Sequence, residues 1–421
     1  MTFKYTSLIN SGLRGLISLS KFVLTLVIAS KFDLSILGEY SLVVNAVLIT
    51  IFIIGFEVYQ YTSRSIIIDP KDQFQYIQKH FIYIVTAFLY ISPLFYLFFH
   101  FGVIKMDYLI PLYILLLFEL ISNEQYRLLI ALKHPIFANL VLFIRTSIWI
   151  YLFLILLKLK FSLADPLLVI IKFWSIGAFI SILIPLVYFI KIHKGSFGKI
   201  KGLPSFSLIV NYWKQCYVLF FASIALMLIN IVDKFVVDFY CEKTVLGVYS
   251  LYFSLTSMVF TFVLAGVISV TYPHLVESYQ LDKSRYKREL RQFSKRLLIS
   301  SLLMGLLSVI IFKAYLYFNA QEVEKLSLIY ENMSAYVLLL ISFIIYTLHM
   351  KFHYELYATK NDAAIMKANY VTFIIYLCIL VPFTNAFAIL GAAGAHLVAS
   401  ISMFILKKRF AIKYDAIRGL E

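Results

Sequence analysis

Leu37-Gly38-Glu39-Tyr40-Ser41-Leu42 returns later in the chain as Leu246-Gly247-Val248-Tyr249-Ser250-Leu251. The two copies of this LG-x-YSL motif begin 209 residues apart in a chain of 421 residues. Each copy lies between two long apolar segments, and each follows a Lys-Phe-Val triplet, at Lys21–Val23 and at Lys234–Val236. A match near half-length in the same hydropathy context predicts an internal duplication.

The composition places the whole chain in a lipid bilayer. Hydrophobic residues make up 62% of the sequence and charged residues only 14%. Soluble proteins carry about 45–50% apolar and about 25% charged residues, so 14% charge cannot cover a soluble surface of this size. The sequence therefore predicts an all-α, polytopic integral membrane protein.

Twelve segments are long and apolar enough to cross a membrane, which takes roughly 20 residues each. The first carries Arg14 and Lys21 and no clear cleavage site follows it, so we expect a retained helix and not a signal peptide. The predicted spans are about 10–31, 40–60, 81–101, 108–131, 136–157, 166–190, 209–232, 247–274, 297–318, 332–357, 366–384 and 388–407.

The distribution of Lys and Arg between these spans predicts the orientation. With the N-terminus in the cytoplasm, 23 of these residues fall in cytoplasmic segments and seven outside. This asymmetry follows the positive-inside rule and puts both termini in the cytoplasm. The basic stretch Lys283–Arg296 is expected to be an interfacial helix that anchors the topology, with binding of anionic membrane lipids as the alternative.

The duplication divides the chain into two halves. Residues 1–202 hold six predicted spans and residues 203–421 hold six more, joined by a basic, glycine-containing linker at 191–204. An even number of spans gives both halves the same orientation, so we expect two parallel six-helix halves around a central cavity. The LG-x-YSL motif should then mark the external turn between the first two helices of each half. Its glycines should end or bend a helix, and Tyr40 and Tyr249 should lie at the membrane interface.

Several polar and charged residues lie inside the predicted spans. Asn10, Arg14 and Lys21 share one face of the first span, because they are four and seven residues apart on a helix. Arg145 lies deep in the fifth span with no acid within one turn, so it is expected to face a water-filled cavity. With Lys234, these groups predict a cationic lumen for an anionic substrate, since guanidinium and ammonium groups pair well with phosphates and carboxylates.

Other intramembrane charges allow two interpretations. Asp233 is adjacent to Lys234 and either neutralises it in a structural ion pair or shares a lumen with it. Glu119, Asn123 and Arg127 stack at four-residue spacing beside Glu124. That row is either an internal salt-bridge ladder or a relay for protons or ions.

The sequence lacks the motifs that are typical of several other classes of protein. The sequence has no phosphate-binding P-loop, and its three cysteines are scattered singly, with no disulfide or zinc spacing. His349 and His353 lack a clear acidic third metal ligand, and no large external loop carries a catalytic constellation. We therefore expect no catalytic residues, metal, cofactor or nucleic-acid partner, and a protein that is not an enzyme.

The motifs together resemble bacterial O-antigen and polysaccharide repeat-unit flippases, within the multidrug/oligosaccharidyl-lipid/polysaccharide flippase superfamily. The resemblance covers essentially the whole chain. It rests on the serine-rich first helix with Arg14, the Leu37-Gly38 pair, Tyr59-x-Tyr61-x-x-Arg64, and Asp233-Lys234 followed by LGVYSL.

The resemblance implies a flippase that moves an undecaprenyl-diphosphate-linked oligosaccharide across the bacterial inner membrane by alternating access. Asn10, Arg14, Lys21, Arg145 and Lys234 would bind the head group, and Glu57, Glu119, Glu124 and Asp233 are the candidates for ion coupling. A polysaccharide polymerase and a chain-length regulator are candidate partners. The alternatives are a multidrug or ion antiporter of the same superfamily and a membrane-embedded polysaccharide polymerase or ligase.

Overall fold

The computed structural model describes residues 3–159, 163–192 and 205–417, and all regular structure in these ranges is helical. Residues 193–204 of the predicted linker lie outside the described residues. The main helices of the N-terminal part are α1 (Phe3–Lys31), α2 (Leu34–Gly55), α3 (Val58–Ile68), α4 (Gln73–Ile91), α5 (Leu97–His100), α6 (Leu109–Ala131), α7 (Pro135–Phe143), the π-helix η4 (Ile144–Ile148), α8 (Trp149–Lys158) and α9 (Pro166–Ile192).

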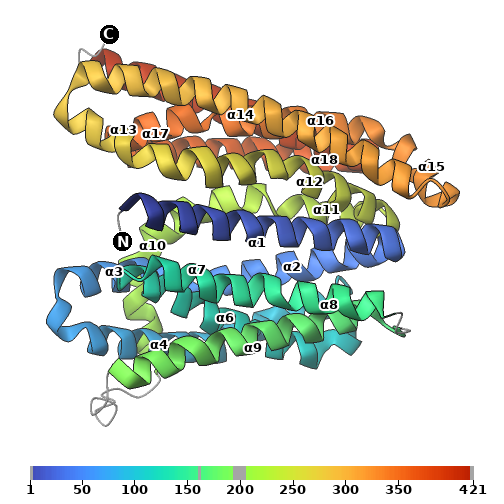
Figure 1. The fold of residues 1–421 in the computed structure, drawn as a ribbon, viewed down its shortest axis with the longest axis horizontal. Coiled ribbons are helices and arrows are strands. Elements are labelled where there is room, and N and C mark those ends of the chain that lie inside the picture. The colour runs from blue at the N-terminus through green and yellow to red at the C-terminus, as the bar shows by residue number, and fades with distance from the viewer. Residues whose placement is uncertain (1–2, 160–162, 193–204, 418–421) are drawn as a thin grey trace. The chain divides into compact units, whose positions relative to one another are not determined.

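The C-terminal part of the chain is also built from helices (Figure 1). Its helices are α10 (Phe206–Ile229), α11 (Val232–Tyr240), α12 (Lys243–Val263), the π-helix η5 (Leu264–Ile268), α13 (Ser269–Leu281), α14 (Lys283–Phe318), α15 (Val323–Glu331), α16 (Met333–Leu348), α17 (Met350–Ala358) and α18 (Asp362–Ile417). Short 3-10 turns lie at Pro70–Asp72 (η1), Ser92–Tyr96 (η2) and Met106–Tyr108 (η3).

Within the described residues, eleven helical segments are long and apolar enough to cross a membrane. Each overlaps a predicted span, and the last, Asp362–Tyr414, covers both the eleventh and the twelfth. The helical run there is broken at Phe387 and Ala388, where Ala388 has a φ of 49°. A Cβ on Gly391 would collide with the backbone of Phe383 and Thr384, so the chain folds back on itself at this point. The all-α, multi-span prediction is confirmed.

The chain forms two compact units. Unit 1 contains Met1–Lys21 and Leu42–Phe221, and unit 2 contains Phe22–Ser41 and Ala222–Glu421. In unit 1, α6 packs on α9 and α7, and α3 packs on α4 and α6. In unit 2, α16 packs on α18 and α12, and α14 packs on α12 (Figure 1). The division into six-helix halves at residues 202 and 203 stays a prediction.

The repeated motif is a helix crossing inside unit 2. Gly38 lies within α2 and Gly247 within α12, and a Cβ on Gly247 would collide with the backbone carbonyl of Leu34. Ser250 Oγ donates to Ser41 Oγ at 2.8 Å, so equivalent residues of the two copies meet each other. The prediction that these glycines end or bend helices was wrong. The glycines instead let two backbones approach closely, as small residues do between membrane helices.

A methyl group at this crossing should destabilise the protein. We expect Gly247→Ala to cost about 1–3 kcal/mol or more, because the backbone of Leu34 cannot move aside as a flexible side chain could. Gly394→Ala is the matched control, since nothing lies within 4 Å of the added Cβ and alanine favours the helix. Thermal unfolding in detergent measures both variants. Equal unfolding temperatures would contradict a close backbone crossing.

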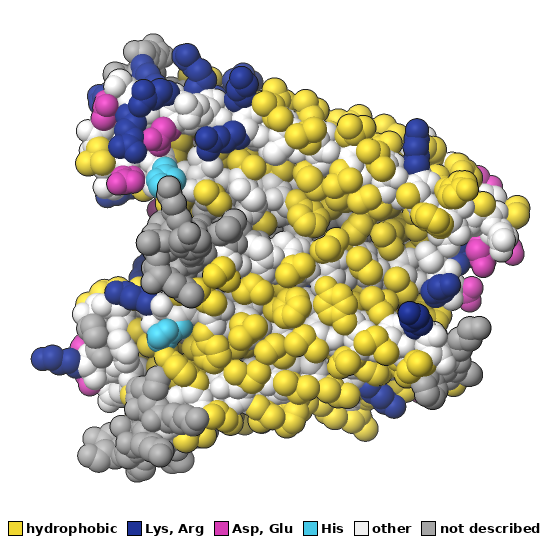
Figure 2. Space-filling model, in the orientation of Figure 1, with side chains coloured by type: hydrophobic (Ala, Val, Ile, Leu, Met, Phe, Trp, Pro, Cys, Tyr) yellow, Lys and Arg dark blue, Asp and Glu magenta, His cyan; other side chains and the backbone are white. Residues whose placement is uncertain are grey.

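The basic stretch forms the start of α14. Asp282 caps this helix by accepting hydrogen bonds from the backbone N–H and the hydroxyl of Ser284, both at 2.8 Å. These bonds hold the pKa of Asp282 below its usual value. Figure 2 shows Lys and Arg side chains gathered around this end of α13 and α14, while hydrophobic side chains cover much of the visible face along the helices. The predicted basic helix is therefore continuous with a membrane span.

Candidate functional site in unit 1

Helix α6 carries the polar row that the sequence singled out. Its members Glu119, Asn123, Glu124 and Arg127 lie within the span, and both glutamates are buried. They meet polar side chains from five other parts of unit 1, namely α1, the α2–α3 junction, α4, the α7–η4 segment and α9. We call this group the charged cluster, and its members are Asn10, Arg14, Lys21, Glu57, His80, Glu119, Asn123, Glu124, Arg127, Asn139, Arg145 and Trp174.

Arg145 is paired with an acid from another helix. It lies in the π-helix η4, is 8% exposed, and its Nε is 3.6 Å from Glu119 Oε2. Its Nη1 also donates to Asn123 Oδ1 at 3.3 Å, and Trp174 Nε1 donates to Glu119 Oε1 at 2.6 Å. The sequence predicted that Arg145 faces a water-filled cavity because no acid lies within one turn of it, but the structure buries it against Glu119. Sequence spacing reveals neighbours on the same helix and not those across a helix interface.

Glu124 forms the second centre of the charged cluster. It is fully buried and accepts from Arg127 Nη1 at 2.9 Å, and its Oε2 is 3.0 Å from His80 Nε2. His80 Nδ1 in turn lies 3.0 Å from Thr62 Oγ1. The row on α6 is therefore part of a network of hydrogen bonds and ion pairs that joins α3, α4 and α6. Sequence reasoning missed His80, whose only signal was a histidine at the edge of a predicted span.

Glu57 lies next to this centre in a strained backbone. Phe56 and Glu57 have φ values of 44° and 57° between α2 and α3, a conformation that bulky side chains rarely adopt. Glu57 is buried and accepts from Gln60 Nε2 at 2.5 Å, close enough to Arg127 for electrostatic interaction. The Arg127 guanidinium lies 4.0 Å from the centroid of the Tyr59 ring. Three of the four predicted ion-coupling acids thus belong to one cluster.

The polar face of α1 contacts the same cluster. Arg14 Nε donates to Asn139 Oδ1 at 3.3 Å, and Asn139 Nδ2 donates to Asn10 Oδ1 at 2.9 Å. Lys21 is close enough to Arg145 and Glu119 to interact with both electrostatically. Arg14 and Lys21 are exposed, whereas Glu119 and Glu124 are buried. Asn10, Arg14 and Lys21 were predicted to share one face of the first span. That face therefore lies against Asn139 of α7, Arg145 of η4 and Glu119 of α6.

Asp233 and Lys234 form a separate buried pair in unit 2. Lys234 Nζ is 2.9 Å from Asp233 Oδ1, donates to the Asn230 carbonyl at 2.8 Å and lies 3.0 Å from the centroid of the Phe253 ring. Tyr249 of the second LG-x-YSL copy donates to Asp233 Oδ2 at 2.7 Å. Tyr249 is fully buried, so its side chain packs inside the protein, and its predicted depth at the membrane interface stays a prediction. These contacts support the interpretation of Asp233 and Lys234 as a structural ion pair. A role of Lys234 in substrate binding stays a prediction.

Unit 2 buries further polar groups that the sequence did not single out. Ser342 Oγ lies 2.7 Å from His396 Nδ1 and 2.8 Å from Ser400 Oγ. Lys407, which the charge count placed in a cytoplasmic segment, is fully buried with its Nζ 3.3 Å from His353 Nδ1. The burial of Lys407 could not be predicted from the sequence, because it depends on how α17 and α18 pack against each other.

Comparisons with known proteins agree on the fold. A scan against protein-family models and a search of curated proteins both find no match. Among solved structures, an inward-facing multidrug resistance MATE family transporter of the MOP superfamily matches with a TM-score of 0.70 at 11% identity, covering 98% of each chain. A mutant of the Vibrio cholerae MATE transporter VcmN matches with a TM-score of 0.58 at 13% identity, covering 99% of this chain and 98% of that chain.

A third structure, the outward-facing conformation of a multidrug resistance MATE family transporter of the MOP superfamily, matches with a TM-score of 0.57 at 14% identity. It covers 99% of this chain and 95% of that chain. The chain is therefore a multi-pass membrane protein with the fold of MATE transporters. These neighbours belong to the superfamily that the sequence resemblance indicated, and likeness at this identity concerns the fold.

Proposed function

We propose that this protein is a transporter that moves an undecaprenyl-diphosphate-linked oligosaccharide, such as an O-antigen or other surface-polysaccharide repeat unit, across the bacterial inner membrane. One observation carries the proposal. Lys21 lies in the middle of the Gly12–Lys31 span, is exposed, and lies near Arg145. An ammonium group at mid-bilayer costs roughly 2.5–3.5 kcal/mol on insertion scales, which favours an aqueous space over lipid as the surroundings of Lys21.

The charges of the cluster favour an anionic substrate. Glu119 and Glu124 are buried and held by Arg145, Trp174, Arg127 and His80, so they offer little to a ligand. Arg14 and Lys21 are exposed cations. Arg14 donates hydrogen bonds to Asn139 and Tyr126, and both of these acceptors are neutral. A diphosphate supplies the charge and acceptor oxygens that guanidinium and ammonium groups bind best.

Alternating access supplies the mechanism. The head group enters from the cytoplasm, pairs with Arg14 and Lys21, and is released outside, with no bond made or broken, so the protein is not an enzyme. An ion that binds to Glu119 would release Arg145 from its 3.6 Å pair to join the diphosphate, and an ion gradient would act on the site in this way. Otherwise, removal of the product by a polysaccharide polymerase, with its chain-length regulator, gives the net direction.

A multidrug antiporter is the second candidate, because the solved structures with this fold are named as multidrug transporters. The two candidates differ in which charges they need. A carrier of cationic drugs depends on acids that face its substrate, whereas the exposed charges of the cluster on α1 are basic.

Gene deletion in the native bacterium tests the proposal. We expect surface polysaccharide to be lost and lipid-linked repeat units to accumulate facing the cytoplasm, with both restored by the wild-type gene. Sensitivity to a panel of cationic drugs should stay unchanged. Normal polysaccharide together with increased drug sensitivity would replace the first candidate by the second.

A further inference from the structure

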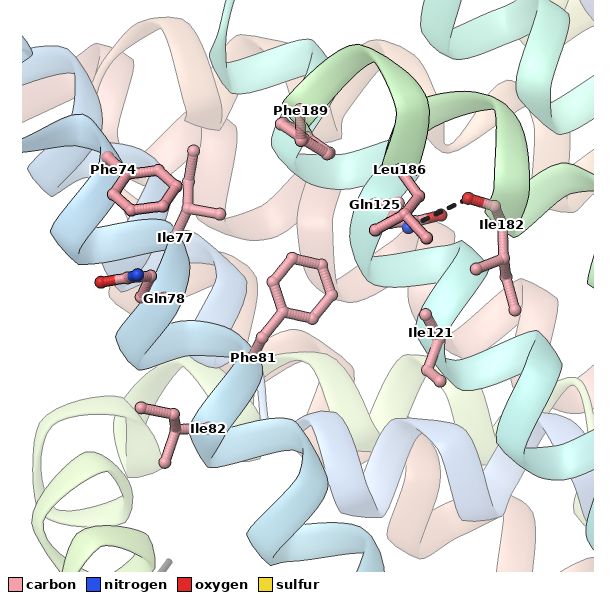
Figure 3. A pocket seen from close by; sticks show the side chains of 10 residues that line it. All are labelled: Phe74, Ile77, Gln78, Phe81, Ile82, Ile121, Gln125, Ile182, Leu186 and Phe189. Atoms are coloured by element: carbon pink, nitrogen blue, oxygen red, sulfur yellow. Dashed lines mark hydrogen bonds between the residues drawn. The ribbon is translucent and has the colours of Figure 1, made fainter. Parts of the chain in front are cut away.

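A groove in unit 1 lies between α4, α6 and α9 (Figure 3). Its volume is about 320 Å³, at the lower end of the roughly 300–1,000 Å³ of small-molecule pockets. All three helices lie in candidate membrane spans, so the groove is at membrane depth. It therefore suits a short apolar segment of a membrane-embedded molecule.

The lining changes with depth along the helices. Phe74 and Phe189 lie close to the helix ends at Gln73 and Ile192. Gln78 and Gln125 lie about 8–9 Å from the ends of α4 and α6, at a rise of about 1.5 Å per residue. Ile121 and Ile182 lie about 15 Å from the ends of α6 and α9. Gln78 and Gln125 thus lie at similar distances from the helix ends, within a lining that is otherwise apolar (Figure 3).

Each of these two glutamines has one unsatisfied polar atom. Gln125 is 3% exposed, and its Nε2 donates to the Ile182 carbonyl at 3.4 Å (Figure 3). Its Oε1 and the Nε2 of Gln78 are buried and have no hydrogen-bond partner among the described residues. Buried polar groups without partners cost free energy, more so in a membrane, so an acceptor and a donor here indicate an oxygen-bearing occupant.

The groove and the charged cluster use the same helices. On α4, His80 belongs to the cluster and Gln78 to the groove, and on α6 the adjacent residues Glu124 and Gln125 divide in the same way. A molecule with an anionic head and a long apolar chain matches both features. This inference rests on the proposed function, which supplies such a molecule.

We propose that the groove binds the head-proximal isoprene units of the polyprenyl chain, with Gln78 Nε2 donating to an oxygen of the phosphate end. The apolar residues that lie deeper along the helices than the two glutamines, Phe81, Ile121 and Ile182, hold the hydrocarbon. The lipid tail of the substrate is then recognised by the protein and does not simply remain in bulk lipid. The volume limits recognition to a short part of the chain.

Lipid retention during native mass spectrometry tests the groove. The probe is undecaprenyl phosphate, with dioleoylphosphatidylglycerol in excess as competitor. We expect the wild type to retain the probe, and Ile121→Trp and Ile182→Trp, which fill the groove from α6 and α9, each to lose about tenfold in retention. Ile114→Trp is the matched control on α6, because Ile114 is 44% exposed and outside the groove lining. Unfolding temperatures confirm that the variants fold.

Two results would overturn the groove assignment: displacement of the probe by the phospholipid at equal concentration, or wild-type retention by both filled variants. Undecaprenol, which lacks the phosphate, separates this inference from the proposed function. Retention of undecaprenol that depends on Ile121 and Ile182, in a protein whose deletion leaves polysaccharide unchanged, supports the groove and rejects the flippase. Loss of export in Lys21→Ala together with groove-independent retention rejects only the groove.

Discussion

Glu119→Gln should destabilise the protein by about 3–5 kcal/mol, because it leaves the Arg145 guanidinium buried without its counter-charge. Arg145→Gln should have a similar effect, since Glu119 would lose its paired guanidinium and keep its hydrogen bond from Trp174 and its electrostatic interaction with Lys21. The double substitution should be less destabilising than the sum of the two, by about 0.5–3 kcal/mol, as expected of coupled partners. Reversible unfolding in detergent measures the cycle.

A matched control is Glu277→Gln. Glu277 forms an exposed ion pair with His274 at 3.9 Å, and exposed pairs contribute about 0–1 kcal/mol. If Glu119→Gln unfolds like Glu277→Gln, then the Arg145–Glu119 pair is not a buried structural element. If the double variant is stable and still exports polysaccharide, then Arg145 does not bind substrate.

Lys21→Ala and Arg14→Ala should each lower export of the lipid-linked repeat unit by about tenfold to a hundredfold. Each removes a charge-assisted hydrogen bond to phosphate, worth about 1.5–3 kcal/mol. Lys21→Arg should retain most of the activity, because the positive charge remains at the same depth. Surface polysaccharide, normalised to the amount of folded protein in the membrane, is the measurement.

Lys31→Ala supplies the control for this experiment, because Lys31 is an exposed lysine at the end of the same helix. It should export at the wild-type level. Export by folded Lys21→Ala and Arg14→Ala at that same level would remove the cationic face of α1 from substrate binding. The proposal of an anionic substrate would then lose its main supporting observation.

The sequence alone determined the fold class and the positions of the candidate membrane spans along the chain. Every candidate span overlaps a predicted one, including the pair that α18 joins through its break at Phe387 and Ala388. This success has a physical reason. A bilayer requires about 20 apolar residues and internally bonded backbone in each crossing, and both requirements act locally along the chain.

The tertiary structure alone decided which charged and polar side chains meet. Arg145 pairs with Glu119 on another helix, Glu124 meets His80 from α4, and Lys407 is buried beside His353. The sequence also revealed the LG-x-YSL repeat, but only the packing showed that its two copies touch through Gly38, Gly247, Ser41 and Ser250. Such contacts depend on the rotation and register of one helix against the next. Both are determined jointly by side chains that are distant from each other in the chain. Hydropathy places a residue in the membrane, whereas packing decides whether it faces a partner, a groove or an aqueous space.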